Sequence, residues 1–382
     1  MQKIKNIEKA AERIRKAVSR GQRIILYGDS DLDGISSVVI LEEAIKSLGG
    51  EVNSVFFPDR ENDGYGINQN ALDILKNRVP ALLITLDLGI GNIKEVRLAN
   101  QMGFEVLIVD HHEALAEVPE AFIIVDPKQK DDDYPFKNLA NVGITFKLCE
   151  ELLGHRVSQQ LRNSFLELAA LGTIADMVPQ VDENQRIIEE GLRSLKNTFR
   201  PALRAFLEII GAGQVFENSI QKIISGLNAA EDSINFENDS YRLLTCPSLE
   251  KCKEMAQALL DRSKNKQQQI KNIIQEVERR VSEKTDQPII FEGDPAWRLT
   301  FAGSVASQLC QKYEKPVFIY KKLSRESCGS VRNPKGTNSV EAMKICAGFL
   351  LTYGGHAQAS GFRVKNENLE KFQTCLNNYF KK

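Results

Sequence analysis

Short apolar runs alternate with longer segments of mixed polarity along the first half of the chain. The runs rich in Val, Ile, Leu and Phe occupy residues 23–29, 51–59, 81–87, 104–110 and 121–127, and segments of helical length lie between them at 34–48, 69–78 and 91–101. Apolar strands separated by helices are typical of a parallel sheet covered by helices on both faces. Because ligands of such sheets bind outside the carboxyl ends of the strands, the pattern also predicts where a site lies.

The second half of the chain predicts a long polar helix followed by a smaller α/β domain. Residues 250–284 carry apolar positions at helical spacing among charged residues and glutamines, without Gly or Pro, which indicates one long solvated helix. The strand-like runs beyond it are 287–292, 316–322 and 328–333, with a helical segment at 302–313. The expected domains are an α/β domain over 1–200, a helical connector over 201–286 and a second α/β domain over 287–382.

Acidic side chains follow the apolar runs at the predicted binding edge. Asp29 and Asp31 come after the first run, Asp87 comes after the third, and His111 follows the fourth within the sequence VDHH. If the strands are neighbours, these side chains converge, and carboxylates at one point repel each other unless divalent cations neutralise them. Oxygen ligands with one or two histidines suit Mn²⁺ or Mg²⁺, and several carboxylates favour two ions that share one of them.

Asp33 leaves two interpretations open. It lies in the sequence DLDGISS, which opens a predicted helix, so its side chain could cap that helix or shape the turn. It could equally be a metal ligand, because it lies at the same alternating spacing as Asp29 and Asp31.

Composition narrows the class of protein without identifying it. The chain has 382 residues, 42% of them hydrophobic and 26% charged, with a formal net charge of −1. That balance excludes a globally basic nucleic-acid-binding surface but not a local basic cleft. No apolar stretch approaches the roughly 18 to 20 residues that span a bilayer, so we expect no membrane partner. Seven cysteines without a Cys-x-x-Cys pair predict reduced thiols, a cytoplasmic protein and no zinc site.

Four short sequences, in order along the chain, resemble the motifs of the DHH phosphoesterase superfamily. They are GDSDLDGISS, LDLGI, VDHH and LGTIADMVP, and the match is greatest to RecJ-like single-strand-specific exonucleases. The sequences RLTFAGSVASQL and YGGHAQASGF resemble the companion DHHA1 domain. The resemblance extends from about residue 24 to residue 362. It implies an exonuclease that uses two Mn²⁺ ions, with Mg²⁺ as the alternative.

The resemblance also assigns roles to individual residues. It implies metal ligands at Asp29, Asp31, Asp87, His111 and Asp176. Asp87 would bridge the two ions, and His112 would contact the phosphate or its water as a second catalytic residue. Periodicity alone would describe Asp176 only as an acid at a helix end.

The chain departs from the family pattern at one position beside the predicted site. Tyr27 stands where the family often has a histidine, and a phenol with a pKa near 10 is a poor Mn²⁺ ligand. We therefore expect one ion to be held more weakly or to take an extra water. Asp126 also ends an apolar run, but no family motif covers it, so we interpret it as structural.

Residues of the second domain are implied as phosphate contacts. Gly354 and Gly355 would let backbone amides approach a phosphate, and His356 would donate to it. Arg332 falls where the family presents a phosphate-binding arginine, although an ordinary surface arginine explains it equally well.

Three functions compete at this stage. The first is an exonuclease that releases mononucleotides from single-stranded DNA or RNA in DNA repair, recombination or replication, with replication or repair proteins as partners. The second is an oligoribonuclease or cyclic-dinucleotide phosphodiesterase. The third is a non-catalytic replisome scaffold, which would be expected to lose metal ligands that this chain keeps. Only 20 residues follow Phe362, too few for an oligonucleotide-binding barrel, so we expect a compact form of the enzyme.

Overall fold

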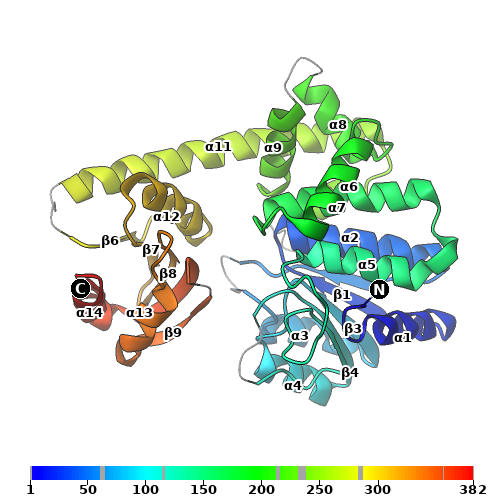
Figure 1. The fold of residues 1–382 in the computed structure, drawn as a ribbon, viewed down its shortest axis with the longest axis horizontal. Helices are drawn as coiled ribbons and strands as arrows, with labels where there is room; N and C mark the ends of the chain where they lie inside the picture. Colours follow the sequence, from blue (N-terminus) through cyan, green and yellow to red (C-terminus); the bar gives the residue numbers. More distant parts are fainter. Residues whose placement is uncertain are drawn as a thin grey trace. The chain divides into compact units, whose positions relative to one another are not determined.

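Two compact units make up the chain. The structure is a computed structural model that describes residues 2–60, 65–113, 117–211, 216–230, 238–282, 287–355 and 357–381. Contacts between residues divide the chain into Met1–Ser263 and Lys264–Lys382 (Figure 1). The division falls inside α11 (Leu249–Ser282), which is the long helix that the polar pattern predicts over 250–284.

The first unit contains a parallel sheet of five strands. The strands are β1 (Ile24–Gly28), β2 (Ser54–Phe56), β3 (Ala81–Leu86), β4 (Phe104–Val109) and β5 (Ile123–Val125). Their order is β2-β1-β3-β4-β5, and every neighbouring pair is parallel. The chain goes from β1 outward to β2 and then returns to the other side of β1 as β3. The carboxyl ends of β1 and β3 are therefore the switch point where such sheets bind ligands.

Helices cover both faces of this sheet, as the apolar runs predict. Leu26 belongs to a large core formed with α1 (Ile7–Ser19), α2 (Leu32–Ser47) and α5 (Asn141–Leu153). Ile25, on the opposite face, packs with residues of α3 (Gln69–Leu75) and α4 (Ile93–Met102). All five residues of β1 are buried. Since consecutive side chains of a strand point to opposite sides, both faces of the strand are covered.

Further helices extend the larger core. They are α6 (Gln159–Ala175), α7 (Asp182–Leu195), α8 (Pro201–Ile210), α9 (Phe216–Leu227) and α10 (Asp239–Leu244). The Tyr241 hydroxyl of α10 donates to Glu42 of α2 at 2.9 Å, which ties α10 to a helix that covers the sheet. Among the helices that the structure describes, none has the length and apolar character needed to cross a membrane.

The second unit contains a mixed sheet between helices. Its strands are β6 (Ile290–Asp294), β7 (Val317–Lys322), β8 (Glu326–Arg332), β9 (Leu350–Gly355) and β10 (Ala359–Lys365), in the order β6-β7-β8-β10-β9. Only β6 and β7 are parallel. One core joins α12 (Leu299–Tyr313) to the later part of α11, and the other includes α13 (Ser339–Ile345) and α14 (Leu369–Phe380). The prediction of a smaller α/β domain after a long helix is confirmed.

One disulfide corrects the expectation that all seven thiols are reduced. Cys346, directly after α13, is bonded to Cys375 of α14, 29 residues further along the chain. The prediction was wrong for this pair because tertiary packing of the two helices brings together cysteines that have no recognisable spacing. The other five cysteines are free thiols.

Candidate metal centre

Four neighbouring strands each end directly before an aspartate. Asp29 follows β1, Asp87 follows β3, Asp110 follows β4 and Asp126 follows β5. The backbone N–H groups of the first three each donate to the carbonyl of the last residue in the next strand, at 3.0–3.1 Å. The sheet therefore continues through these positions and holds the carboxylates along one edge. Asp87 has a left-handed backbone with a φ of 66°, which ends its strand abruptly.

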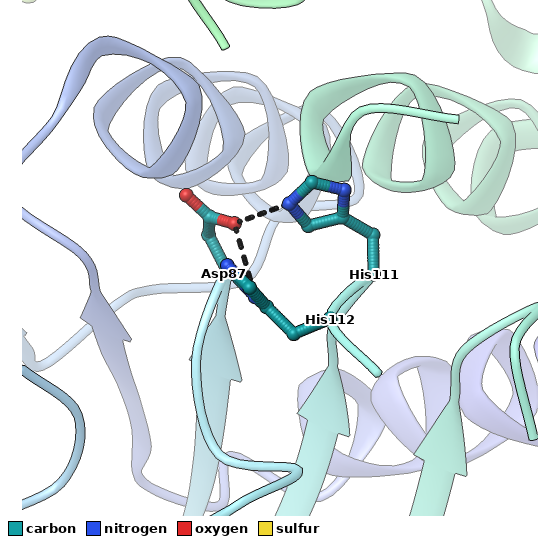
Figure 2. Close-up of side chains that lie close together, drawn as sticks. All are labelled: Asp87, His111 and His112. Atoms are coloured by element: carbon teal, nitrogen blue, oxygen red, sulfur yellow. Dashed lines mark ion pairs between the residues drawn. The ribbon is translucent and has the colours of Figure 1, made fainter. Parts of the chain in front are cut away.

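Three groups of side chains at this edge have ligand atoms close enough to hold metal ions. The groups are Asp29, Asp31 and Asp87; Asp87, His111 and His112; and Asp33, His111 and Asp176. Within each group the ligand atoms lie within 4.8 Å of one another. Asp87 and His111 each belong to two groups, and Figure 2 shows the Asp87 carboxylate facing both histidine rings. The structure thus brings together all five residues predicted as metal ligands.

The hydrogen bonding of His111 indicates that a cation belongs in this centre. Its Nδ1 lies 3.1 Å from the Leu139 carbonyl oxygen, so Nδ1 carries the proton and Nε2 presents a lone pair. That lone pair lies 3.2 Å from Oδ1 of Asp87 and 3.7 Å from Oδ2 of Asp176. His111 Nε2 and Asp176 Oδ2 are buried and have no hydrogen-bond partner among the described residues. Acceptors that face one another fit a divalent cation.

The pKa of His111 agrees with this arrangement. Burial, followed by the nearby charge of His112, lowers the pKa of His111 to about 3, so its imidazole is neutral at physiological pH. A neutral imidazole is the form that binds metals.

Asp110 and His112 form a second pair beside the cluster. The His112 Nδ1 lies 2.8 Å from Oδ1 of Asp110, and Oδ2 of Asp110 accepts the backbone N–H of Ile90 at 2.9 Å. Burial lowers the pKa of His112, but the hydrogen bond that Nδ1 donates to Asp110 and the Asp110 charge outweigh burial and raise the pKa to about 9. His112 therefore carries a positive charge at neutral pH, held in place by an aspartate that is itself fixed by the backbone.

Arg60 neutralises part of the carboxylate cluster. Its Nε donates to Oδ1 of Asp29 at 2.8 Å, its terminal nitrogen pairs with the other oxygen, and the same nitrogen lies 3.0 Å from Oδ2 of Asp31. Burial raises the pKa of Asp29, and the Arg60 charge opposes this without cancelling it. For Asp31 the opposing charge of Arg60 and the hydrogen bond from Gly34 prevail over burial, and the pKa is lowered.

Asp33 caps a helix, but not the one that it opens. Its two carboxylate oxygens accept the backbone N–H groups of Asn141 and Val142, at 2.8 and 2.6 Å, at the start of α5. The cap of α2 is instead Asp31, which accepts the Gly34 N–H at 3.1 Å. Capping therefore accounts for Asp33, although its position within a ligand group leaves metal binding open.

Asp176 reaches the cluster from the end of α6. It is the last residue before the chain leaves the helix, and its backbone N–H donates to the Gly172 carbonyl at 2.9 Å. Gly172 lies against α2, where an added Cβ would be 3.4 Å from the Cα of Asp33. Burial, followed by the charge of Asp31, raises the pKa of Asp176 to about 7.

Gly34 gives this centre a testable packing requirement. A Cβ at Gly34 would lie 2.5 Å from the Asp29 carbonyl oxygen and 2.8 Å from the Asp29 nitrogen, both backbone atoms that cannot rotate away. We expect Gly34→Ala to displace the loop that carries Asp29 and Asp31 and to weaken Mn²⁺ binding by 10-fold or more, the range of roughly 10–100-fold seen when support of metal ligands is lost. Calorimetric titration with Mn²⁺ measures the change.

Gly91 provides the matched control for that substitution. It lies in the loop after Asp87, and a Cβ added there would meet no atom within 4 Å. Gly91→Ala should leave Mn²⁺ affinity within about twofold of the wild type. Equal affinities for both variants would show that close packing at Gly34 does not position the acidic loop.

Three of the four residues predicted as phosphate contacts in the second domain lie at the ends of strands. Arg332 ends β8 and donates to the Val331 carbonyl at 2.9 Å. Gly354 and Gly355 end β9, and Gly355 has a φ of 123° with Ala359 and Ser360 backbone atoms 2.7 Å from an added Cβ, so glycine is required there. His356 lies outside the described residues.

Tyr27 and Asp126, at the ends of two strands of the first sheet, were not predicted as metal ligands. Tyr27 is fully buried, and its hydroxyl donates to the Gly66 carbonyl at 3.3 Å and accepts from Asn68 at 3.3 Å. It belongs to the core on the α3 and α4 side of the sheet. Asp126 is also buried, and one of its oxygens accepts the Lys128 N–H at 2.8 Å. Both have structural partners in addition to any role near the cluster.

The sequence analysis assigned no role to Asp110, Arg60 or Tyr65. Asp110 lies within VDHH and follows its strand directly, as Asp29 and Asp87 do, so the strand-end pattern locates it without giving its partner. Arg60 and Tyr65 lie in DRENDGYGIN, a stretch that resembles the family but carried no assigned role. The Tyr65 hydroxyl donates to the Asp87 carbonyl at 2.9 Å and lies 3.1 Å from a ring nitrogen of His112.

Two family models match this chain, and single-stranded-DNA-specific exonucleases are among the proteins similar to it. Residues 23–173 match the model of the DHH family, N-terminal domain, and residues 286–382 match the DHHA1 domain. The single-stranded-DNA-specific exonuclease RecJ of Bacillus subtilis is 33% identical over 98% of this chain, which spans 48% of that protein's length.

Two solved structures are also similar. A crystal structure of exonuclease RecJ bound to manganese is 27% identical, with a TM-score of 0.81 over 100% of this chain and 95% of that one. RecJ of Thermus thermophilus in complex with Mn²⁺ is 25% identical, with a TM-score of 0.84 over 99% of this chain and 55% of that one.

Proposed function

This chain belongs to the DHH family and carries a DHHA1 domain, and from that premise we propose that it hydrolyses phosphodiester bonds of single-stranded nucleic acid with the help of divalent metal ions. The observation that supports the proposal most directly is the lone pair of His111 facing the carboxylates of Asp87 and Asp176. A scaffold would have no need for such a costly arrangement of buried acceptors.

We propose that two ions are held by the five predicted ligands. Asp29 and Asp31 would bind one ion, His111 and Asp176 would bind the other, and Asp87 would bridge them because it belongs to groups on both sides. Oxygen ligands with one imidazole favour Mn²⁺, with Mg²⁺ as a weaker substitute. When bound, such ions polarise the phosphate and activate the attacking water.

The remaining side chains would orient and neutralise the substrate. His112, with a pKa of about 9, keeps a proton on Nε2 while Nδ1 is held by Asp110, so it would donate to a phosphate oxygen. The fixed Asp110 contact prevents the ring from turning away, which is the contribution of positioning to catalysis. In the second domain, Arg332, Gly354, Gly355 and His356 would contact phosphate groups of the nucleic acid.

A nuclease assay on metal-free protein tests the proposed function. Protein stripped with EDTA should leave end-labelled single-stranded DNA and RNA intact, and Mn²⁺ should restore release of mononucleotides at a rate higher than Mg²⁺ does. Blunt duplex DNA should be cleaved far more slowly than the single strand. The rates of hydrolysis of single-stranded DNA, single-stranded RNA and a cyclic dinucleotide are compared at the same protein concentration.

The other outcomes of this assay would replace the proposal. Preference for the cyclic dinucleotide would identify a small-substrate phosphodiesterase. Absence of hydrolysis with every metal and substrate would favour the non-catalytic scaffold, and full activity in EDTA would contradict the metal centre.

A further inference from the structure

The residue after Asp176 has an unusual backbone conformation. Asp176 is the C-terminal cap of α6, and Met177 follows it with a φ of 61°. Helices commonly end with a left-handed residue at this position, and it is usually glycine because a side chain is strained there. A bulky residue with a positive φ is a true outlier. A methionine at this position therefore strains the backbone, whereas a glycine would not.

Packing and hydrogen bonding do not account for the methionine side chain. Met177 is 84% exposed, more than any other large apolar residue that the structure describes. Its backbone N–H donates to the Ile174 carbonyl at 3.4 Å, a contact that any residue except proline could make. Removing the side chain should therefore relax the backbone without opening a cavity.

Met177 directly follows a residue of the metal centre. It is bonded to Asp176, whose Oδ2 lies 3.7 Å from Nε2 of His111. Consecutive Cα atoms are only about 3.8 Å apart, so an exposed, unbranched apolar residue adjoins a predicted metal ligand in the chain.

We propose that Met177 contacts the nucleobase of the nucleotide whose phosphate is cleaved, an inference that rests on the proposed function. The methionine side chain offers neither a positive charge nor a hydrogen-bond donor to a phosphate, whereas a base is uncharged and presents an apolar face that it can contact. A flexible and polarisable thioether packs well on aromatic rings, and contact with a ring face does not depend on which base is present. Met177 would thus position the nucleotide at the metals without selecting sequence.

Met177→Gly separates this role from a purely structural one. The glycine should maintain or raise the melting temperature, yet kcat/KM for single-stranded DNA should fall roughly three- to tenfold, mainly through KM. A second substrate is single-stranded DNA whose terminal nucleotide lacks its base, made once with the base-free nucleotide at the 5′ end and once at the 3′ end. On the substrate whose cleaved nucleotide has no base, wild type and variant should have equal kcat/KM. Met177→Leu, which keeps an apolar side chain, should retain the wild-type value.

Glu314→Gly is the matched control. Glu314 is an exposed residue at the end of α12 in the second unit, with a left-handed φ of 50°. Its replacement should relieve the same backbone strain without changing kcat/KM on any substrate.

Four results would overturn the inference. Unchanged kinetics of Met177→Gly on normal DNA would show that the side chain does not contact the base. An equal loss on normal and base-free DNA, or a loss of Mn²⁺ affinity, would show that the residue acts only through Asp176. If the wild-type protein cleaves no single strand while hydrolysing a cyclic dinucleotide, the proposed function itself fails and the inference fails with it.

Discussion

Asp87→Asn is expected to reduce metal-dependent hydrolysis by more than about 100-fold, beyond the range of losses seen when only the support of a metal ligand is removed. Asp87 is 2% exposed and belongs to two of the three ligand groups, so its substitution affects both proposed ions at once. Asparagine keeps the shape of the side chain but supplies no negative charge. Turnover on labelled single-stranded DNA and bound Mn²⁺ per chain are the two measurements.

The same variant should not be less stable when metal is absent. Burial and the charges of Asp33, Asp31, Asp29 and Asp176 raise the pKa of Asp87 well above its ordinary value. The charged form is thus unfavourable in the metal-free fold, and removing it should leave the melting temperature in EDTA equal or higher. This separates loss of metal from loss of folding.

Asp73→Asn serves as the control for Asp87→Asn. Asp73 is a partly exposed residue of α3 whose carboxylate pairs with Lys76 at 3.3 Å. Both its turnover and its Mn²⁺ content should equal those of the wild type. If Asp87→Asn retained half of the wild-type turnover with two ions bound, the bridging role would be wrong.

Metal-free protein is expected to lose stability as the pH rises from about 5 to 9. Burial raises the pKa of Asp176 and of Asp126 to about 7, from an ordinary value of 3.8. Each carboxyl therefore binds its proton more tightly in the folded state than in the unfolded state. The stability that this tighter binding contributes is lost as the pH rises from 3.8 through 7. The loss is at most a few kcal/mol for each group, at about 1.4 kcal/mol per unit of pKa difference.

The two histidines of the centre act in different pH ranges. Because the pKa of His111 is lowered to about 3, its contribution rises with pH between 3 and 6.5 and opposes the carboxyls there. Because the pKa of His112 is raised to about 9, its contribution is present below 6.5 and is lost between 6.5 and 9. Above pH 6.5 the contribution of each of these carboxyl and histidine groups to stability either falls with pH or is already constant. The loss of stability in the metal-free protein should therefore be clearest above pH 6.5.

Mn²⁺ should reverse this dependence on pH. Bound cations favour the charged carboxylates, so stability in saturating Mn²⁺ should rise with pH through the acidic range. At 100 times its dissociation constant, an ion adds about 2.7 kcal/mol per site, which corresponds to a shift of several degrees in melting temperature. Thermal unfolding in EDTA and in Mn²⁺ between pH 5 and 9 tests both slopes. Parallel curves under the two conditions would contradict a carboxylate metal centre.

Most of the first sheet and part of its site could be predicted from local pattern. The apolar runs predict all five strands of the first unit, because β1, β3, β4 and β5 are almost entirely buried and such strands can be recognised without a distant partner. Since parallel strands end at one edge, Asp29, Asp87 and His111 could be expected to converge. The resemblance to a known family added Asp176, which lies 65 residues beyond His111 and has no periodic signal of its own.

Only the tertiary structure decided which partners these residues have. The packing of α6 on α2 brings Asp176 to the cluster, and the start of α5 lies where Asp33 can cap it. The pairing of Arg60 with Asp29 and the disulfide between Cys346 and Cys375 likewise join residues 29 or more positions apart. The sequence by itself determined the elements and the acids at their ends, because these depend on local periodicity. Partners, protonation and strain depend on contacts between distant segments, which local pattern does not contain.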